Sequence, residues 1–246
     1  MRVYVLDTGI RTTHNDFEGR SSFGFNSIGG GNNDVDGHGT HCAGTVMGGD
    51  FGVSKAAQSV AVKVLDDDGF GSTASIIAGM DWAVADNVSG RKVISMSLGG
   101  PASSATDNAV ASAVAANVPV VVAAGNELRN ACLGSPARSP DAITVGATDS
   151  SDTLSWFSNY GTCVDILAPG SNILSAGNAN DNAETSLSGT SMACPHVAGA
   201  AANYLSANPN ASPAQVRSYL TSSAAANQID LRGNNDTPNL LLQQSC

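Results

Sequence analysis

The sequence predicts an α/β fold of three layers, in which a mainly parallel central sheet is covered by helices on both faces. Short runs rich in β-branched residues alternate with Ala-rich helical runs along the whole chain. The strand runs are almost continuously apolar, which is typical of parallel strands that are buried on both faces. The 246 residues include 27 glycines and only 13% charged residues, so helices can pack closely on such a sheet. No repeat or low-complexity linker interrupts the pattern, and we expect residues 1–246 to form one domain.

Six strands are expected, each as a short apolar run bounded by turn residues. Their predicted ranges are Val3–Leu6, Val60–Leu65, Val93–Ser97, Val118–Ala123, Ile143–Gly146 and Asp165–Leu167. The carboxyl ends of parallel strands meet at one edge of a sheet, where open α/β sheets place their binding sites. Polar residues that follow these strands are therefore candidates for function.

Five helices are expected between and after the strands. Their predicted ranges are His38–Met47, Ser72–Asp86, Ser104–Ala116, Ser191–Ala207 and Pro213–Ser222. The last has a clear start signal, because Ser212 can cap it and Pro213 suits its first position. Helices that connect parallel strands cross over the sheet and so cover its faces.

Charge and hydropathy exclude some classes of function. The formal net charge is −10, and phosphate contacts need Lys and Arg, so we expect no nucleic-acid partner. No apolar run reaches the length of a transmembrane helix, and no membrane partner is expected. The first strand follows Met1 almost at once, and no signal-peptide pattern precedes it.

Three segments carry the residue types of nucleophilic catalysis. VYVLDTGI is an apolar strand that ends in Asp7, DGHGTHCAG places His38 at the start of a helix, and GTSMACPHVAGAAA places Ser191 at the start of another. Alone, a serine before a helix is usually a cap. Together, the three side chains could orient a base, accept a proton and attack a carbonyl carbon. The free N–H groups at the helix start would also favour the resulting oxyanion.

These segments, in the order Asp, His, Ser, resemble the catalytic motifs of the subtilisin-like serine proteases, or subtilases. The segment SNYGTCVDILAPG, from Ser158 to Gly170, is most similar to the proteinase K and aqualysin branch of that family. The resemblance implies a subtilisin-like fold and a secreted, extracellular serine endopeptidase. It implies that Asp7, His38 and Ser191 form the catalytic triad.

A fourth motif, VVVAAGNE, ends a predicted strand with Asn126. Outside this context, such an asparagine would usually form a turn. The resemblance implies instead that its side chain donates to the oxyanion, together with the backbone N–H of Ser191. His41 is expected to be structural, and no catalytic role is expected for His14 or His196.

The resemblance also implies a groove for polypeptide substrates. Two extended segments are expected to hold the peptide as an added strand, and a pocket of small residues is expected to receive the side chain before the cleaved bond. The substrate-binding residues implied are Ser97, Leu98, Gly99, Gly69, Phe70, Gly71, Ala123, Ala124, Gly125, Gly134 and Ser135. Small apolar walls without a matched charge predict broad cleavage after apolar or aromatic residues.

Five cysteines are present. The resemblance implies a disulfide between Cys132 and Cys163, which is consistent with an oxidising compartment. Cys42 is expected one helical turn from His38 as a free buried thiol. A contact between Cys42 and Cys194 and the partner of Cys246 are left open, because sequence does not fix connectivity.

A structural calcium ion is a further expectation from the resemblance. Pro140 and Ala142 would supply carbonyl ligands and Asp165 a carboxylate, with waters completing the shell. No cofactor is expected for catalysis. The run Asp66–Asp68 lacks the alternating ligand pattern of an EF-hand and is expected to be a solvated loop.

Two other functions remain open at this stage. The chain could be a silent, peptide-binding pseudoprotease or an inert truncated fragment. Subtilases normally carry further mature residues before the first strand, preceded by a propeptide and a signal peptide, and we expect these to be missing from this chain. The propeptide is an expected partner, and a monomer is the expected state.

Overall fold

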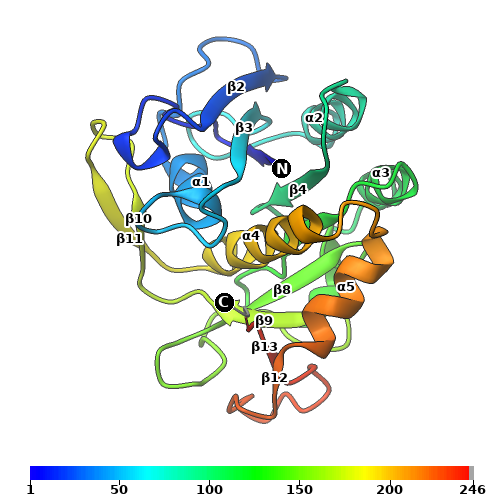
Figure 1. Ribbon diagram of the computed structural model, residues 1–246. Helices are drawn as coiled ribbons and strands as arrows, with labels where there is room; N and C mark the ends of the chain where they lie inside the picture. Colours follow the sequence, from blue (N-terminus) through cyan, green and yellow to red (C-terminus); the bar gives the residue numbers. More distant parts are fainter. Residues whose placement is uncertain (244–246) are drawn as a thin grey trace.

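The computed structural model describes residues 1–243, so Cys246 lies outside the described residues. Within them, the main sheet has nine strands in the order β12-β13-β9-β8-β6-β4-β1-β3-β2 (Figure 1). The strands are β1 (Arg2–Asp7), β2 (Ser21–Asn26), β3 (Gln58–Lys63), β4 (Lys92–Met96), β6 (Val120–Ala123), β8 (Ile143–Thr148), β9 (Ile166–Pro169), β12 (Ala225–Ala226) and β13 (Leu240–Leu241). Neighbouring strands are parallel except β12 and β13, which confirms a mainly parallel sheet.

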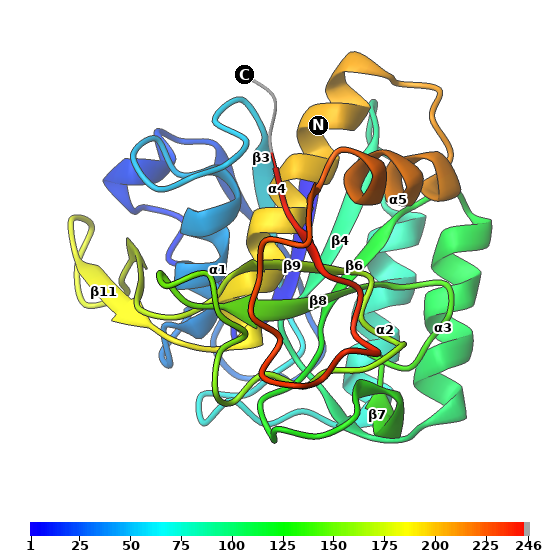
Figure 2. The ribbon, with the colours of Figure 1, turned by 90° about the horizontal axis from the view of Figure 1, so that it is seen from below.

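Helices cover both faces of this sheet, as predicted. The helices are α1 (His38–Met47), α2 (Thr73–Ala85), α3 (Ser104–Ala115), α4 (Thr190–Ala207) and α5 (Pro213–Ser222). Figures 1 and 2 show α2 and α3 side by side, with α4 crossing the sheet on the opposite face. Along β1, Val3 and Val5 join the core under α1 and α4, while Tyr4 and Leu6 join the core under α2. Successive side chains of a strand point to opposite faces of the sheet, so β1 contributes residues to two separate apolar layers.

Small residues bring the helices close to the sheet and its loops. A Cβ atom on Gly39, at the start of α1, would collide with the carbonyl oxygen of Gly9 in the loop after β1. A Cβ on Gly199 of α4 would lie 2.8 Å from the Cβ of Val53 and 3.0 Å from the carbonyl oxygen of Val46. Glycine at these positions therefore permits contacts that a larger residue would prevent.

The predicted strands and helices all form, with small shifts at their ends. Strand β6 begins at Val120 and not at Val118. The sequence did not predict several short elements: β2, β5 (Gly100–Pro101), β7 (Gly134–Ser135), β10 (Ile173–Ala176), β11 (Glu184–Leu187), β12, β13 and the 3₁₀ helices Asn15–Phe17 and Ala131–Leu133. The two-residue strands and the half-exposed hairpin of β10 and β11 are set by their tertiary partners, because they have too few residues for a hydrophobic period. Strand β2 has six residues, but none of them is buried, so its sequence lacks a buried apolar face. Within residues 1–243, no helix is both long and apolar enough to cross a membrane.

Candidate active site

The segments that carry Asp7 and His38 meet at one edge of the sheet. Asp7 is the last residue of β1 and is fully buried, and His38 is the first residue of α1. The carboxylate oxygen Oδ1 of Asp7 lies 2.7 Å from Nδ1 of His38 and accepts a hydrogen bond from the backbone N–H of Thr8 at 2.8 Å. This contact fixes the imidazole so that its other nitrogen, Nε2, is available as a base.

A second buried carboxylate, Asp34, ties the two segments together. It accepts hydrogen bonds from the Thr8 hydroxyl at 2.7 Å, from the Gly37 N–H at 2.9 Å and from the Thr40 N–H at 2.8 Å. The Thr8 hydroxyl in turn accepts from the Gly39 N–H at 3.0 Å. The loop after β1 is therefore bonded directly to the start of α1. The sequence analysis missed Asp34, although it stands only four residues before His38.

Ser191 lies in the first turn of α4, after the cap residue Gly189, as predicted. Its hydroxyl donates to the carbonyl oxygen of Ser97 at 3.1 Å, and the Ser97 hydroxyl donates to the carbonyl oxygen of Ser191 at 2.8 Å. Within residues 1–243, the Ser191 hydroxyl does not bond His38. The Cys42 sulfur lies 4.0 Å from His38 Nδ1 and 3.4 Å from the Ser191 carbonyl oxygen, so both residues border the same thiol. Rotation of the Ser191 side chain is needed to bring its hydroxyl to His38.

Asn126 is held beside Ser191 by Thr190. Its amide oxygen accepts hydrogen bonds from the Thr190 backbone N–H at 2.8 Å and from the Thr190 hydroxyl at 2.9 Å. These two donors fix which end of the amide is oxygen, and the amide nitrogen has no partner among residues 1–243. The backbone N–H of Ser191 is likewise unpaired within this part of the chain. Two N–H donors are therefore available where the carbonyl oxygen of a bound peptide would become negative.

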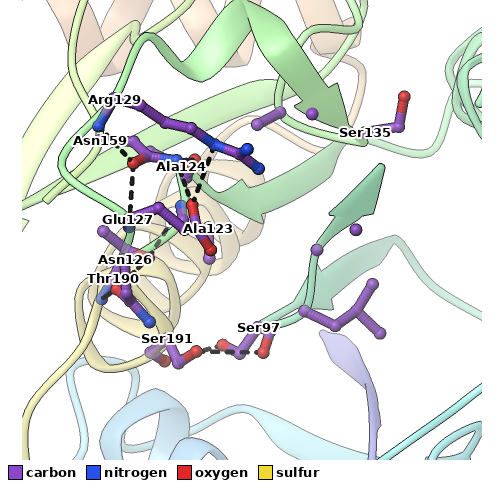
Figure 3. A pocket seen from close by; sticks show the side chains of 16 residues that line it. Ser97, Ala123, Ala124, Asn126, Glu127, Arg129, Ser135, Asn159, Thr190 and Ser191 are labelled. Carbon is purple, nitrogen blue, oxygen red and sulfur yellow. Dashed lines mark hydrogen bonds and ion pairs between the residues drawn. The ribbon is translucent and has the colours of Figure 1, made fainter. Parts of the chain in front are cut away.

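The predicted first pocket forms beside these donors (Figure 3). A cavity of about 230 Å³ brings together Ser191 and Asn126 with the residues predicted for that pocket, which are Ala123, Ala124, Gly125, Gly134 and Ser135, and with Ser97, Leu98 and Gly99 of a predicted extended segment. The short pair β5 and β7 closes one side, because Gly100 and Pro101 pair with Ser135 and Gly134. The five predicted pocket residues therefore line one cavity, although they come from two separate segments.

A second cavity, of about 300 Å³, continues the groove past His38. Both predicted extended segments line it, with Gly69, Phe70 and Gly71 from one and Ser97, Leu98 and Gly99 from the other. Phe70 is 74% exposed, so an apolar ring stands at its edge. The two extended segments predicted to hold a peptide thus line one cavity together with His38.

Comparison with known proteins identifies the family of this chain. The profile of the subtilase family matches residues 1–241. The chain belongs to the subtilase family.

Individual relatives of this subtilase agree. The chain is 49% identical over 239 residues to a cuticle-degrading serine protease of Arthrobotrys oligospora. This match covers 94% of the chain and 58% of that protein. The chain is 51% identical over 244 residues to an extracellular serine proteinase of a Thermus species. This match covers 98% of the chain and 59% of that protein. The chain thus spans just under three fifths of these relatives.

A crystal structure of a cold-adapted subtilisin-like serine proteinase superposes with a TM-score of 0.94 at 45% identity. The match covers 100% of this chain and 89% of that chain. The subtilisin-like, three-layer fold predicted from the sequence is therefore confirmed.

The first pocket of this subtilase differs from the prediction in one respect, because it contains charged groups. Glu127 and Arg129 both line it, with Glu127 Oε2 and Arg129 Nε 3.6 Å apart (Figure 3). The buried side chain of Asn159 donates to Glu127 Oε2 at 2.7 Å and accepts from the Arg129 backbone N–H at 3.0 Å. The predicted absence of charge is thus wrong, although the two charges offset each other. Charged residues directly after the AAGN motif were the signal that could have revealed them.

The cysteines and remaining histidines have the environments expected for this subtilase. Cys132 and Cys163 form a disulfide with an S–S distance of 2.06 Å, which confirms the predicted pairing. Cys42 and Cys194 are free and buried, and burial raises the pKa of each thiol. His41 is buried, and its Nε2 bonds the carbonyl oxygen of Ile173 at 2.9 Å, which suits a structural role.

An arginine side chain contacts two of the three predicted calcium ligands of this subtilase. Nη2 of Arg217, on α5, donates to the carbonyl oxygen of Ala142, and Nε of Arg217 lies 3.8 Å from Oδ1 of Asp165. The other carboxylate oxygen of Asp165 accepts from the Thr144 N–H at 2.8 Å. With a guanidinium group in this position, the set Pro140, Ala142 and Asp165 does not fit a calcium ion. The sequence prediction did not consider Arg217, which stands 52 residues after Asp165.

Proposed function

We propose that this chain is the catalytic domain of a secreted serine endopeptidase, with residues 1–246 as a single domain. The carrying observation is the contact of 2.7 Å between Asp7 Oδ1 and His38 Nδ1, in a groove shared with Ser191 and two unpaired N–H donors. The extracellular serine proteinase among its relatives supports secretion, as does the disulfide. Polypeptides are the proposed substrates.

In the first half of the proposed reaction, Ser191 attacks the carbonyl carbon of the cleaved peptide bond. Nε2 of His38 accepts the hydroxyl proton, and Asp7 holds the Nδ1 proton and stabilises the imidazolium. The negative oxygen of the tetrahedral intermediate accepts hydrogen bonds from the Asn126 amide and the Ser191 N–H. The C–N bond then breaks as His38 returns the proton to the leaving amine.

In the second half, water hydrolyses the acyl-enzyme. His38 accepts a proton from the water as its oxygen attacks the ester carbon, and the same two donors bind the oxyanion. Collapse of this intermediate breaks the bond to Ser191 Oγ, which recovers its proton from His38. We assign no step to a metal ion or cofactor, since these groups supply base, nucleophile and anion donors.

For substrate binding, we propose that the peptide adds as a strand between Gly69–Gly71 and Ser97–Gly99. Ala123, Ala124 and Gly125 give the first pocket small walls, and its two charged groups offset each other. These features support broad cleavage after apolar or aromatic residues. We propose a monomer, with a propeptide encoded outside this chain as its partner.

A peptide-binding protein without catalysis is the alternative that one observation favours, because the Ser191 hydroxyl bonds Ser97 and not His38. Labelling with a fluorophosphonate separates the two functions, since it requires a serine that the base can activate. We expect intact mass spectrometry to show one adduct, mapped to Ser191, and none in Ser191→Ala. A folded wild-type protein that stays unlabelled while it binds peptides would support the alternative.

The pH dependence of the proposed activity follows from the environment of His38. Burial disfavours the charged imidazolium, but the Asp7 carboxylate, the neighbouring Cys42 sulfur and the hydrogen bonds of both to the ring outweigh burial and raise the pKa of His38 well above 6.5. The base must be neutral to accept the serine proton, so activity is lost as pH falls through this raised pKa. We expect the acidic limb of kcat/KM to have its midpoint above pH 6.5.

The matched variant for this measurement is Asp7→Asn. It removes the charge that favours imidazolium, so the residual activity should titrate at a lower pH than in the wild type. Its kcat should also fall by about 10⁴, because the amide no longer holds the correct tautomer. An acidic limb that stays in place in Asp7→Asn would show that another group controls it.

A further inference from the structure

A partly buried ion pair lies at the opposite edge of the sheet from the triad. Asp7 ends β1, whereas Ala142 and Asp165 directly precede β8 and β9, and β1, β4, β6, β8 and β9 are parallel neighbours. Arg217 reaches from α5 to these two strand starts. Its Nη2 bonds the Ala142 carbonyl, and its Nε approaches the Asp165 carboxylate to 3.8 Å.

Two hydrogen bonds to the Thr144 backbone anchor Asp165. One oxygen accepts from the Thr144 N–H at 2.8 Å, and the Asp165 backbone N–H donates to the Thr144 carbonyl oxygen at 2.9 Å. The side chain is 24% exposed, and burial raises the pKa of Asp165 against the opposing effects of Arg217 and the Thr144 N–H. A carboxylate in such a position needs a nearby cation to remain charged at low cost.

We propose that Arg217 takes the place of a structural calcium ion at this edge of the fold. The guanidinium meets both kinds of oxygen that were predicted as calcium ligands, one backbone carbonyl and one carboxylate. It is covalently part of the chain, so it is present at any calcium concentration. The predicted ligand set contains one carboxylate, which a single guanidinium balances in charge.

Calcium and Arg217 exclude each other in this arrangement. A calcium ion needs oxygen ligands at 2.3–2.6 Å, and the Ala142 carbonyl already accepts from the guanidinium. The ion would also bring two positive charges beside a third, with one carboxylate to offset them. Binding would therefore require Arg217 to leave, and the stability of this edge should not depend on calcium.

The test is thermal unfolding in the full chain with Ser191→Ala, which prevents self-cleavage, in EDTA and in millimolar calcium. In the Ser191→Ala protein with Arg217 present, we expect no calcium ion to bind at Asp165. Adding Asp165→Asn should therefore leave any effect of calcium on Tm unchanged. Arg217→Ala should lower Tm in EDTA by about 2–4 °C, the shift of one lost charge pair in a chain of this size. It should also gain a calcium response, which Asp165→Asn then removes.

Arg138→Ala is the matched control. Arg138 pairs with Asp107 at 2.7 Å and is 31% exposed, close to the 32% of Arg217, but its removal should create no calcium response. Arg217→Gln removes the positive charge but keeps a hydrogen-bond donor, and we expect it to behave as Arg217→Ala does. If Arg217→Ala does not fold, Arg217→Gln is measured in its place. Calorimetric titration with calcium supplies a second readout, with binding expected in the Arg217 variants.

Either of two results would overturn the proposal. One is a calcium-dependent rise in Tm with Arg217 present that Asp165→Asn abolishes, because the ion would then displace the guanidinium. The other is an Arg217 variant that folds but neither binds calcium nor gains stability from it, because these oxygens would then not form a cation site. Both measurements are independent of peptidase activity.

Discussion

Ser191→Ala is expected to lower kcat by about 10⁶, the loss that removal of the nucleophile causes in subtilisin, another member of the family. The substitution removes only the hydroxyl group, and α4 keeps its cap at Gly189, so the fold should persist. His38→Ala should have an effect of similar size, because an unactivated serine is a poor nucleophile. Steady-state hydrolysis of a peptide substrate measures both.

The double variant gives the sharper test. If the two side chains act as one unit, Ser191→Ala with His38→Ala should be little slower than either single variant, because each already removes the same pathway. Thermal unfolding is the control for folding. Multiplicative losses, or retained turnover in Ser191→Ala, would contradict the proposed mechanism.

Asn126→Leu is expected to lower kcat by about 10²–10³ with little change in KM. This range is the one measured when the equivalent donor is removed from subtilisin. The Asn126 amide meets a charge that exists only near the transition state, so the substrate loses little affinity when the amide is removed. Separate determination of kcat and KM distinguishes this role from substrate binding.

Thr190→Val is the companion variant for Asn126. It keeps the shape of the side chain but removes a hydroxyl that donates to the Asn126 amide oxygen and accepts from the Gly125 N–H at 3.0 Å. Asn126 retains the Thr190 N–H, so kcat should fall in the same direction but by less. A rise in KM as the main effect of either variant would make Asn126 a binding residue.

Sequence motifs located most of the site because each carries its local structure with it. An apolar strand that ends in Asp7, and helices that begin at His38 and near Ser191, formed within one residue of their predicted positions. Parallel strands and crossover helices then bring the ends of these segments to one edge of the sheet. The first-pocket residues followed for the same reason.

Other features depended on contacts between distant parts of the chain. Asn159 meets Glu127 across 32 residues, and Arg217 meets Ala142 across 75. Neither pair has a period or spacing that a single sequence reveals. The calcium prediction left out Arg217 for this reason, since two of its three ligands are backbone carbonyls and the side chain that contacts one of them comes from another helix.

The sequence by itself determined the order of six strands and five helices, the two-faced apolar pattern of the sheet and the identity of the groups that could perform catalysis. Hydrophobic period and residue chemistry are local properties, so they can be read along the chain. Only the tertiary structure decided which hydrogen bonds those groups make. It directs the Ser191 hydroxyl to Ser97, anchors Asn126 on Thr190 and sets Arg217 against Asp165. Such contacts form only when the two segments are positioned to within a few tenths of an ångström. Packing of the whole chain fixes these positions.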